Sequence, residues 1–234
     1  MYAVFGIRNL LAAIVTMVIL FTGIVMLIQM PGDAISIGLL AMKVGTYTVS
    51  GFLALGSIKP VFGFFWNVMN RILPSSFPNI TGEWEGYLES NVTVQEILRE
   101  AARSTDRQFD QFDPEQVETI KLLKIPARIT INANILKIDV TMVVTSRDKK
   151  SQSHSIAVKP LVSVNGEPHS LAYIFQSSRL NPEADDTSSH IGAAHLLLTR
   201  ENDSLMLQGT YWTSRNWRRA SNTAGALTFK RVKT

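Results

Sequence analysis

Tyr211, Thr213 and Arg215 fall at alternate positions of one stretch of the chain and combine a ring, a hydroxyl and a guanidinium. Residues two apart share a face of a β-strand, so all three continue the inward face begun by Leu205 and Leu207. A charge at the end of an inward face needs a partner, because an unpaired buried charge is costly. The pattern indicates a non-covalent binding site for a polar ligand, with Arg215 as its strongest candidate residue.

Four more residues complete the candidate ligand-binding set. Trp84 faces inward in a strand that begins near Ile80, Tyr173 faces inward in another expected strand, and Asn222 and Thr223 open the last one. Two alternatives stay open at this point. Trp84 is equally suited to closing the bottom of a barrel as a core residue, and the tyrosines are equally suited to a core.

The residue types that catalysis requires are not grouped in this sequence. The chain has no cysteine, which excludes disulfides, thiolate nucleophiles and cysteine-ligated metals. A zinc site needs three or four converging ligands, whereas the four histidines lie in different expected strands: His154, His169, His190 and His195. No Gly-rich phosphate loop or nucleophile elbow occurs. We expect a protein that is not an enzyme and that holds no metal or other cofactor.

Eight strands are expected to position the candidate residues. The first covers 80–90, where Ile80, Trp84 and Leu88 alternate with polar residues, and Gly82 and Gly86 allow the bending that barrel closure needs. Eight antiparallel strands can close and leave room for one small ligand, as in lipocalins, with a two-sheet sandwich as the alternative. The other seven strands are expected at 125–132, 135–146, 154–165, 169–178, 189–200, 204–214 and 223–233.

Turn residues separate these strands, and one segment interrupts them. Asn165-Gly166 is a strong hairpin signal. Between the first two strands, residues 93–120 contain apolar residues at helical spacing and the turn signal Asp113-Pro114. We expect an insertion of one or two short helices there, and the sequence assigns it no role.

The first 73 residues differ sharply from the rest. They hold only five of the chain's charged side chains. Within them, Leu10–Met30 has no charged residue and Ile35–Ile58 has only Lys43. A membrane crossing takes about 20 helical residues, and Pro31-Gly32-Asp33 reads as the turn between two crossings. The expected organisation is a transmembrane hairpin with an aromatic interfacial segment over 1–73, a linker over 74–79 and a β-barrel domain over 80–234.

Flanking charges predict the orientation of the hairpin. Arg8 precedes the first span and Lys59 and Arg71 follow the second, whereas the turn carries Asp33, so both termini are expected in the cytoplasm. Lys43 either snorkels to the interface or faces other helices. Small residues recur every fourth position in the second span, at Thr46, Ser50 and Ala54, a spacing that lets helices approach closely.

Basic residues gather in the last part of the chain. No acidic residue follows Asp203, although the soluble part as a whole is nearly neutral. The pI near 9.4 therefore does not indicate binding of DNA or RNA. Arg218 and Arg219 are expected to be solvated or to attract anionic lipid head groups.

The arrangement as a whole carries a resemblance to a known family. A two-helix hairpin precedes the strand Ile80-Thr-Gly-Glu-Trp-Glu-Gly86, and the β-rich domain ends in Gly209-Thr-Tyr-Trp-Thr-Ser-Arg215 and Thr223-Ala-Gly-Ala-Leu-Thr-Phe-Lys-Arg231. This resembles the SMODS-associated, two-transmembrane, β-strand-rich effectors of bacterial cyclic-oligonucleotide-based anti-phage signalling systems (CBASS). The insertion at 93–120 matches no motif of that family.

The resemblance implies a function, which we state as an expectation. It implies an inner-membrane protein with a cytosolic barrel that binds a cyclic dinucleotide made by a partner nucleotidyltransferase, after which the helices assemble and disrupt the membrane. The phosphates of such a ligand require cations or amides, and its bases require rings and hydroxyls, which Arg215, Tyr211 and Thr213 supply. The alternative, from Gly82-x-Trp84, is a lipocalin-like barrel for an apolar molecule, and a third is a structural membrane protein with a filled barrel.

Overall fold

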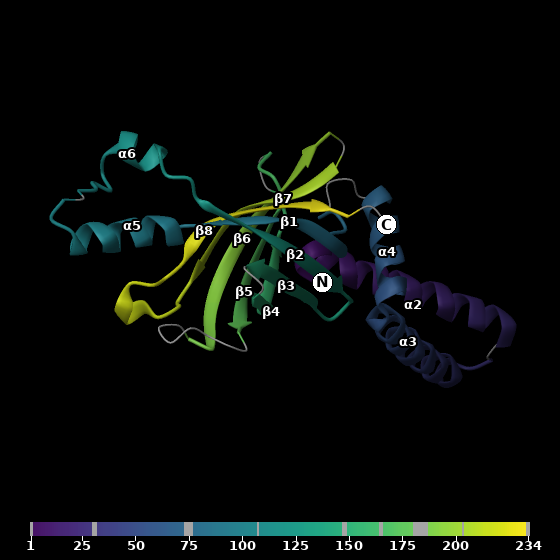
Figure 1. Ribbon diagram of the computed structural model, residues 1–234. Coiled ribbons are helices and arrows are strands. Elements are labelled where there is room, and N and C mark those ends of the chain that lie inside the picture. Colours follow the sequence, from purple (N-terminus) through teal and green to yellow (C-terminus); the bar gives the residue numbers. More distant parts are fainter. Residues whose placement is uncertain are drawn as a thin grey trace. The chain divides into compact units, whose positions relative to one another are not determined.

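The computed structural model describes residues 2–29, 32–72, 77–106, 108–146, 149–163, 166–179, 187–202 and 204–232. They divide into a helical unit, formed by residues 1–81 with 132–138, and a barrel unit formed by 82–131 and 139–234. Each unit is described by itself, and Figure 1 gives the element labels.

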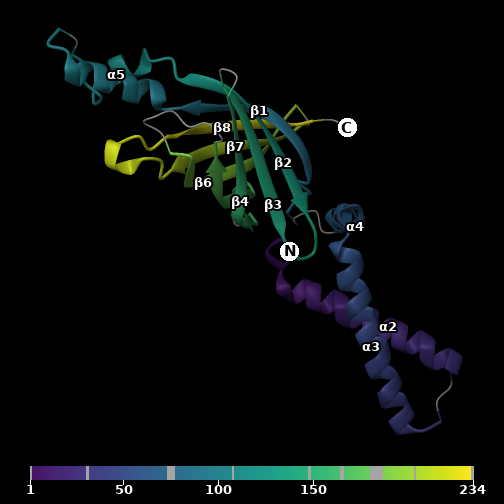
Figure 2. The ribbon, with the colours of Figure 1, turned by 60° about the horizontal axis from the view of Figure 1, so that its bottom comes forward.

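The barrel unit consists of eight antiparallel strands that pair in chain order and close on themselves (Figures 1 and 2). This confirms the expected barrel and excludes the two-sheet sandwich. The strands are β1 Gly82–Ser90, β2 Leu123–Ala133, β3 Ile138–Ser146, β4 Lys149–Leu161, β5 Ser170–Ser178, β6 Ser189–Glu201, β7 Ser204–Thr213 and β8 Ala224–Arg231.

The barrel closes where β1 pairs with β8. Two glycines let these backbones approach: a Cβ on Gly86 would lie 1.9 Å from the carbonyl oxygen of Thr228, and a Cβ on Gly225 would lie 1.8 Å from that of Glu89. Neither distance is compatible with a side chain. The sequence predicts that Gly86 allows bending, and the structure shows that it also allows the close approach of β8.

Alternation along the strands separates the core from the outer surface. Trp84, Ile129 and Phe229 are fully buried inside the barrel. The neighbouring pair of residues on β1 and β2, Glu85 and Arg128, forms an ion pair on the outer surface of the barrel. Period-two alternation of this kind is what one buried sheet face requires.

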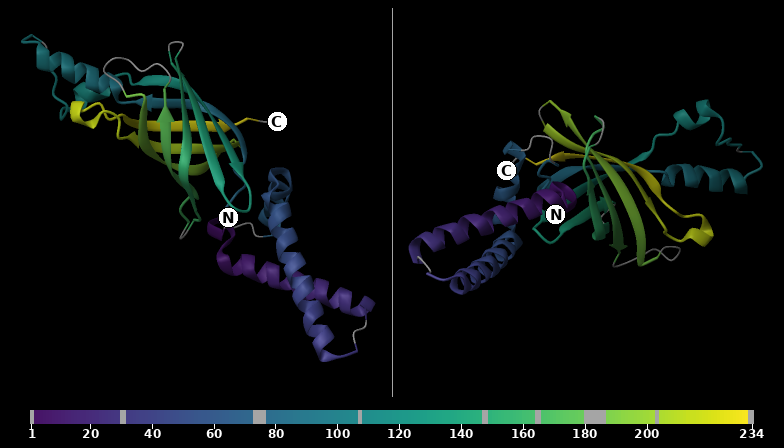
Figure 3. Two further views of the ribbon diagram at one scale, coloured as in Figure 1. Left: turned by 90° about the horizontal axis from the view of Figure 1, so that it is seen from below. Right: turned by 180° about the vertical axis from the view of Figure 1, so that it is seen from behind.

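The insertion between β1 and β2 forms two helices, as expected, which project from the barrel (Figures 1 and 3). They are α5 Val92–Arg103 and α6 Pro114–Glu118. The Asp113 carboxylate accepts a hydrogen bond from the backbone N–H of Glu115 at 3.0 Å, which caps α6.

Several strand bounds shift by a few residues from the prediction, and those of β4 shift most. β4 begins at Lys149 and ends at Leu161, whereas 154–165 was expected. Its register with β5 shifts between Ser155 and Ala157, and such a bulge interrupts the alternation that locates a strand. In the predicted Asn165-Gly166 turn, Gly166 has a positive φ of 82°. Asn165 lies outside the described residues, as do Pro31 and residues 74–76 of the expected linker.

The helical unit contains α1 Tyr2–Phe5, α2 Ile7–Gln29, α3 Ala34–Ser57 and α4 Lys59–Ile72. α2 and α3 are long and apolar enough to cross a membrane. Asp33 caps α3 by accepting a hydrogen bond from the backbone N–H of Ser36 at 2.9 Å. The two expected spans therefore correspond to two helices within a few residues.

Aromatic residues of α4 form the core of the helical unit. Phe62 and Trp66 are buried, and the Trp66 indole N–H donates to the carbonyl of Phe77 at 2.9 Å. Phe5 of α1, which the sequence did not mark, contacts both Phe65 and Trp66 edge to face. The aromatic cluster thus packs within this unit, although Phe64 stays exposed.

We predict that Gly86→Ala destabilises the barrel. The new methyl group meets backbone rather than a movable side chain, so the β1–β8 pairing must shift, at a cost of about 1–3 kcal/mol. Thermal unfolding of the full chain in detergent, followed by near-UV circular dichroism, measures the loss. Gly63→Ala is the matched control, because nothing lies within 4 Å of its added methyl. An unchanged unfolding temperature for Gly86→Ala would contradict the close approach.

Candidate functional site

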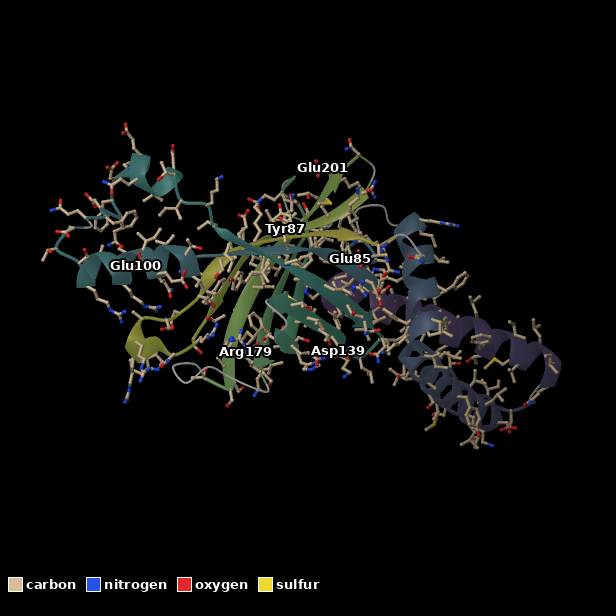
Figure 4. All side chains as sticks on the ribbon, viewed as in Figure 1. Glu85, Tyr87, Glu100, Asp139, Arg179 and Glu201 are labelled. Atoms are coloured by element: carbon tan, nitrogen blue, oxygen red, sulfur yellow. The ribbon has the colours of Figure 1, made fainter. Side chains whose placement is uncertain are left out.

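A cavity of about 120 Å³ opens at one end of the barrel, which we call the mouth. Odd-numbered strands end there and even-numbered strands begin there. In Figure 4, Arg179 lies at this end and Glu201, in the β6–β7 hairpin, lies at the other. The lining residues are Leu88, Ser90, Val92, Ile125, Met142, Val144, Ser153, Phe175, Ser177, Arg179, His190, Tyr211, Thr213, Arg215 and Thr223.

Two strands present the same inward sequence of chemical groups toward the mouth. β5 and the residue after it present an aromatic ring, a hydroxyl and a guanidinium in the order Phe175, Ser177, Arg179. β7 and the residues after it repeat the order with Tyr211, Thr213, Arg215. Because successive inward residues of a strand are about 6.6 Å apart, each series changes from apolar to cationic over little more than 13 Å.

A cluster of hydroxyl groups joins the ends of β1, β7 and β8. The hydroxyls of Thr213 and Thr223 lie 2.9 Å apart, and the Thr223 backbone N–H donates to the Thr213 hydroxyl at 3.1 Å. Tyr211 interacts with the hydroxyls of Ser90 and Thr223. These contacts hold the polar groups of the wall in fixed positions.

Burial sets the protonation of Tyr211. Desolvation raises the pKa of its phenol, while the Ser90 hydrogen bond, the charge of Arg215 and the Thr223 hydrogen bond oppose that shift. The phenol is consequently neutral at physiological pH. Arg215 is close enough to the Tyr211 phenol to act on it electrostatically.

Four of the seven predicted ligand-binding residues line the cavity together. They are Tyr211, Thr213, Arg215 and Thr223. Asn222 is exposed beside it, and its carbonyl accepts a hydrogen bond from the Gln95 side chain of α5. The remaining two, Trp84 and Tyr173, lie deeper in the barrel than the cavity lining.

Trp84 belongs to the core at the opposite end of the barrel. Its side chain is fully buried, and the Arg231 guanidinium lies 5.7 Å from its ring centroid. Ser90 at the mouth is six positions further along β1, which is about 20 Å of extended strand. The placement matches the open alternative in which this tryptophan closes the barrel bottom.

Tyr173 lies one inward position below Phe175 on β5. Their ring centroids are 5.9 Å apart. Its hydroxyl is buried without a hydrogen-bond partner among the described residues. Desolvation raises the pKa of this phenol strongly, so the group stays neutral. An unsatisfied buried hydroxyl costs about 1–3 kcal/mol of folding stability, so this hydroxyl destabilises the core.

Sequence reasoning missed five polar lining residues. They are Ser90, Ser153, Ser177, Arg179 and His190. The signal that singled out Arg215 also applied to Arg179, because both continue an inward face beyond the last strand residue. His190 lines the cavity without further histidines, and no cluster of three or more metal-ligating side chains occurs among the described residues.

The chemistry of this lining suits a small anionic ligand with a flat ring. Guanidinium groups bind phosphate in a bidentate manner, and hydroxyls can donate or accept as a base requires. Pockets that hold a drug-sized ligand measure about 300–1,000 Å³. The cavity is smaller, so it can take one part of such a ligand and leave the rest at the mouth.

We predict that Tyr173→Phe stabilises the barrel at neutral pH by about 1 kcal/mol, because it removes an unsatisfied buried hydroxyl. The gain should increase above pH 10. There the unfolded tyrosine releases its proton while the folded one, with its raised pKa, retains it, so deprotonation favours the unfolded chain. Thermal unfolding at pH 7 and pH 11 measures both effects.

Tyr87→Phe serves as the control for this pair of measurements, because Tyr87 is only half-buried and faces outward on β1. It should give no gain at neutral pH. Equal or lower stability of Tyr173→Phe at neutral pH would mean that the hydroxyl has a partner in solution, such as an ordered water.

In comparisons with known proteins, no protein-family model, curated protein or solved structure matches the chain. The lining of the mouth cavity is therefore the ground on which its function is inferred.

Proposed function

We propose that this chain is a membrane-anchored sensor whose barrel binds a cyclic dinucleotide at the mouth, and that binding leads the helices of several copies to assemble and disrupt the membrane. It is proposed to act as an effector of cyclic-oligonucleotide anti-phage signalling, downstream of a nucleotidyltransferase that makes the ligand.

The single observation that carries this proposal is that two inward series of residues at the mouth each end in an arginine. Arg179 and Arg215 each end a series that also supplies a ring and a hydroxyl. A cyclic dinucleotide carries two phosphates and two bases, so it offers two copies of the groups that such a series binds. The two arginines follow different strands, β5 and β7, and line one cavity, which suits a ligand with two negative charges.

The composition of the lining disfavours an apolar ligand. Nine of the fifteen residues around the cavity are polar or charged. A lipid or other apolar molecule offers no anion to the guanidinium groups of Arg179 and Arg215. The lipocalin-like alternative therefore makes less use of the mouth cavity, even though Gly82 and Trp84 lie toward the other end of the barrel.

Two properties of the helical unit support membrane anchoring. No side chain of α2 or α3 is buried, and large apolar residues such as Leu27, Ile28 and Ile35 are more than 70% exposed. Apolar surface of this extent requires a cover, and lipid provides one. Arg8 and Arg71 flank the pair and Asp33 lies between, which favours cytoplasmic termini.

One face of α3 is suited to contact between copies. Gly45 approaches Val18 of α2, whereas Lys43, Thr46 and Ser50 are exposed. Their spacing of three and four residues puts them on one side of the helix. Small and polar residues at a helix surface in lipid promote close helix–helix association, and a single hairpin is too small to enclose a water-filled path.

The first test is binding of a cyclic dinucleotide panel to the full chain in non-ionic detergent by calorimetry. Arg215→Ala should weaken binding by about 1.5–3 kcal/mol, as expected for loss of a charge-assisted hydrogen bond. Arg200→Ala, an exposed arginine of β6 near the other end of the barrel, is the control with the same charge change. Absence of binding across the panel would refute the proposal.

The second test is leakage of a dye from vesicles that contain the full chain. Ser50→Leu should remove most ligand-dependent leakage, because the bulky side chain blocks close helix approach, and should leave the intrinsic ligand affinity of the barrel domain unchanged. Ala12→Leu is the matched control on an exposed position of α2. Single-molecule counting in the same membranes reports assembly, and leakage without any rise in copy number per spot would exclude ligand-driven assembly.

A further inference from the structure

Hydrogen bonds hold the helix α5 beside the mouth, against the segment that leads into β8. Its start and first two turns make hydrogen bonds about one helical turn apart to consecutive parts of that segment. The bonds run from the Asn91 backbone N–H to the Ala224 carbonyl at 2.9 Å, from the Gln95 amide to the Asn222 carbonyl, and from the Arg99 guanidinium to the Ser221 hydroxyl at 3.0 Å.

An open cleft of about 610 Å³ lies between this helix and the segment 217–221. Four α5 residues line it at positions three and four apart, which place them on one helix face. The lining residues are Glu96, Arg99, Glu100, Arg103, Arg219 and Ser221.

The cleft adjoins the mouth cavity on both of its walls. Val92 lines the cavity, and Glu96, one turn further along α5, lines the cleft. On the opposite wall, Thr223 lines the cavity and Ser221 lines the cleft. Figures 1 and 3 show α5 and the short helix η1 (Trp217–Arg219) at the same end of the barrel.

We propose that this cleft is the outer part of the ligand site and holds the sugar-phosphate ring of a cyclic dinucleotide while one base enters the barrel. The inference rests on the proposed function and extends it to α5, which thereby becomes a wall of the site. It assigns phosphate binding to Arg99, Arg103 and Arg219.

The volumes support this division. The mouth cavity of about 120 Å³ is below the range of about 300–1,000 Å³ typical for a bound small molecule, and the adjoining cleft of about 610 Å³ lies within it. A ligand that uses both spaces spans from the hydroxyl cluster of the barrel to the arginines of α5.

The charges of the cleft suit a nucleotide better than phosphate alone. The cleft is lined by three arginines and two glutamates, so its net charge is positive. Phosphates would bind the guanidinium groups. The carboxylates of Glu96 and Glu100 accept hydrogen bonds only. They match the amino and ring N–H donors of a second base and repel a phosphate, which orients the ligand.

The test measures binding of cyclic di-GMP, cyclic di-AMP and cyclic GMP–AMP to the full chain in non-ionic detergent. Arg103→Ala and Arg219→Ala should each weaken the best-bound compound about ten-fold, the loss expected for one charge-assisted hydrogen bond. Arg99→Lys should retain part of the affinity that Arg99→Ala loses, since it keeps the charge without the fork. Arg200→Ala should bind like the wild type.

The outcomes separate this inference from the proposed function. No binding by the wild type would overturn both. Wild-type binding that Arg215→Ala weakens and that Arg103→Ala and Arg219→Ala leave unchanged would overturn only the role of the cleft. Displacement of the cyclic dinucleotide by dioctanoyl phosphatidylglycerol, with the same arginine dependence, would assign the cleft to lipid head groups and also overturn it.

Discussion

The pairing of β1 with β8 is the constraint on which the rest of the barrel depends. It requires a glycine at Gly86 and at Gly225, because any side chain there would meet the backbone of the partner strand. At one end it sets Trp84 opposite Arg231. At the other end it continues as hydrogen bonds between Asn91 and Ala224, so the start of α5 is fixed where the barrel closes. The strand pairing that closes the barrel therefore also positions α5, the outer wall of the candidate site.

The position of polar groups along the inward faces follows from the cost of burial. Deep in the barrel, most inward residues are apolar, and the Tyr173 hydroxyl is buried there without a hydrogen-bond partner among the described residues. Toward the mouth, hydroxyls form their own hydrogen bonds, as Thr213 and Thr223 do. At the mouth, the guanidinium groups of Arg179 and Arg215 follow the last residues of β5 and β7 and are only partly buried. The order of apolar, hydroxyl and cation is thus a stable way to build an anion site at the end of a packed core.

The sequence predicts those parts of the fold and the site that depend on residues close together in the chain. Alternation located the strands and put Tyr211, Thr213 and Arg215 on one inward face, but it gives the face of a residue and not its depth. For that reason Trp84 and Tyr173 were placed in the ligand set although both lie below the cavity. The cleft was beyond sequence reasoning, because its contact between Arg99 and Ser221 joins residues 122 positions apart.

The placement of α5 also bears on how binding would be coupled to assembly. This helix buries no residue, so the interactions that hold it in place are few, and a ligand that touches both α5 and the barrel adds to them. By linkage, whatever else favours that placement of α5 raises ligand affinity to the same degree. If a second copy bound the same placement of α5, it would supply the differential affinity that the proposed assembly requires. The ligand contact proposed for α5 would then act on assembly through the barrel as well as through the helices.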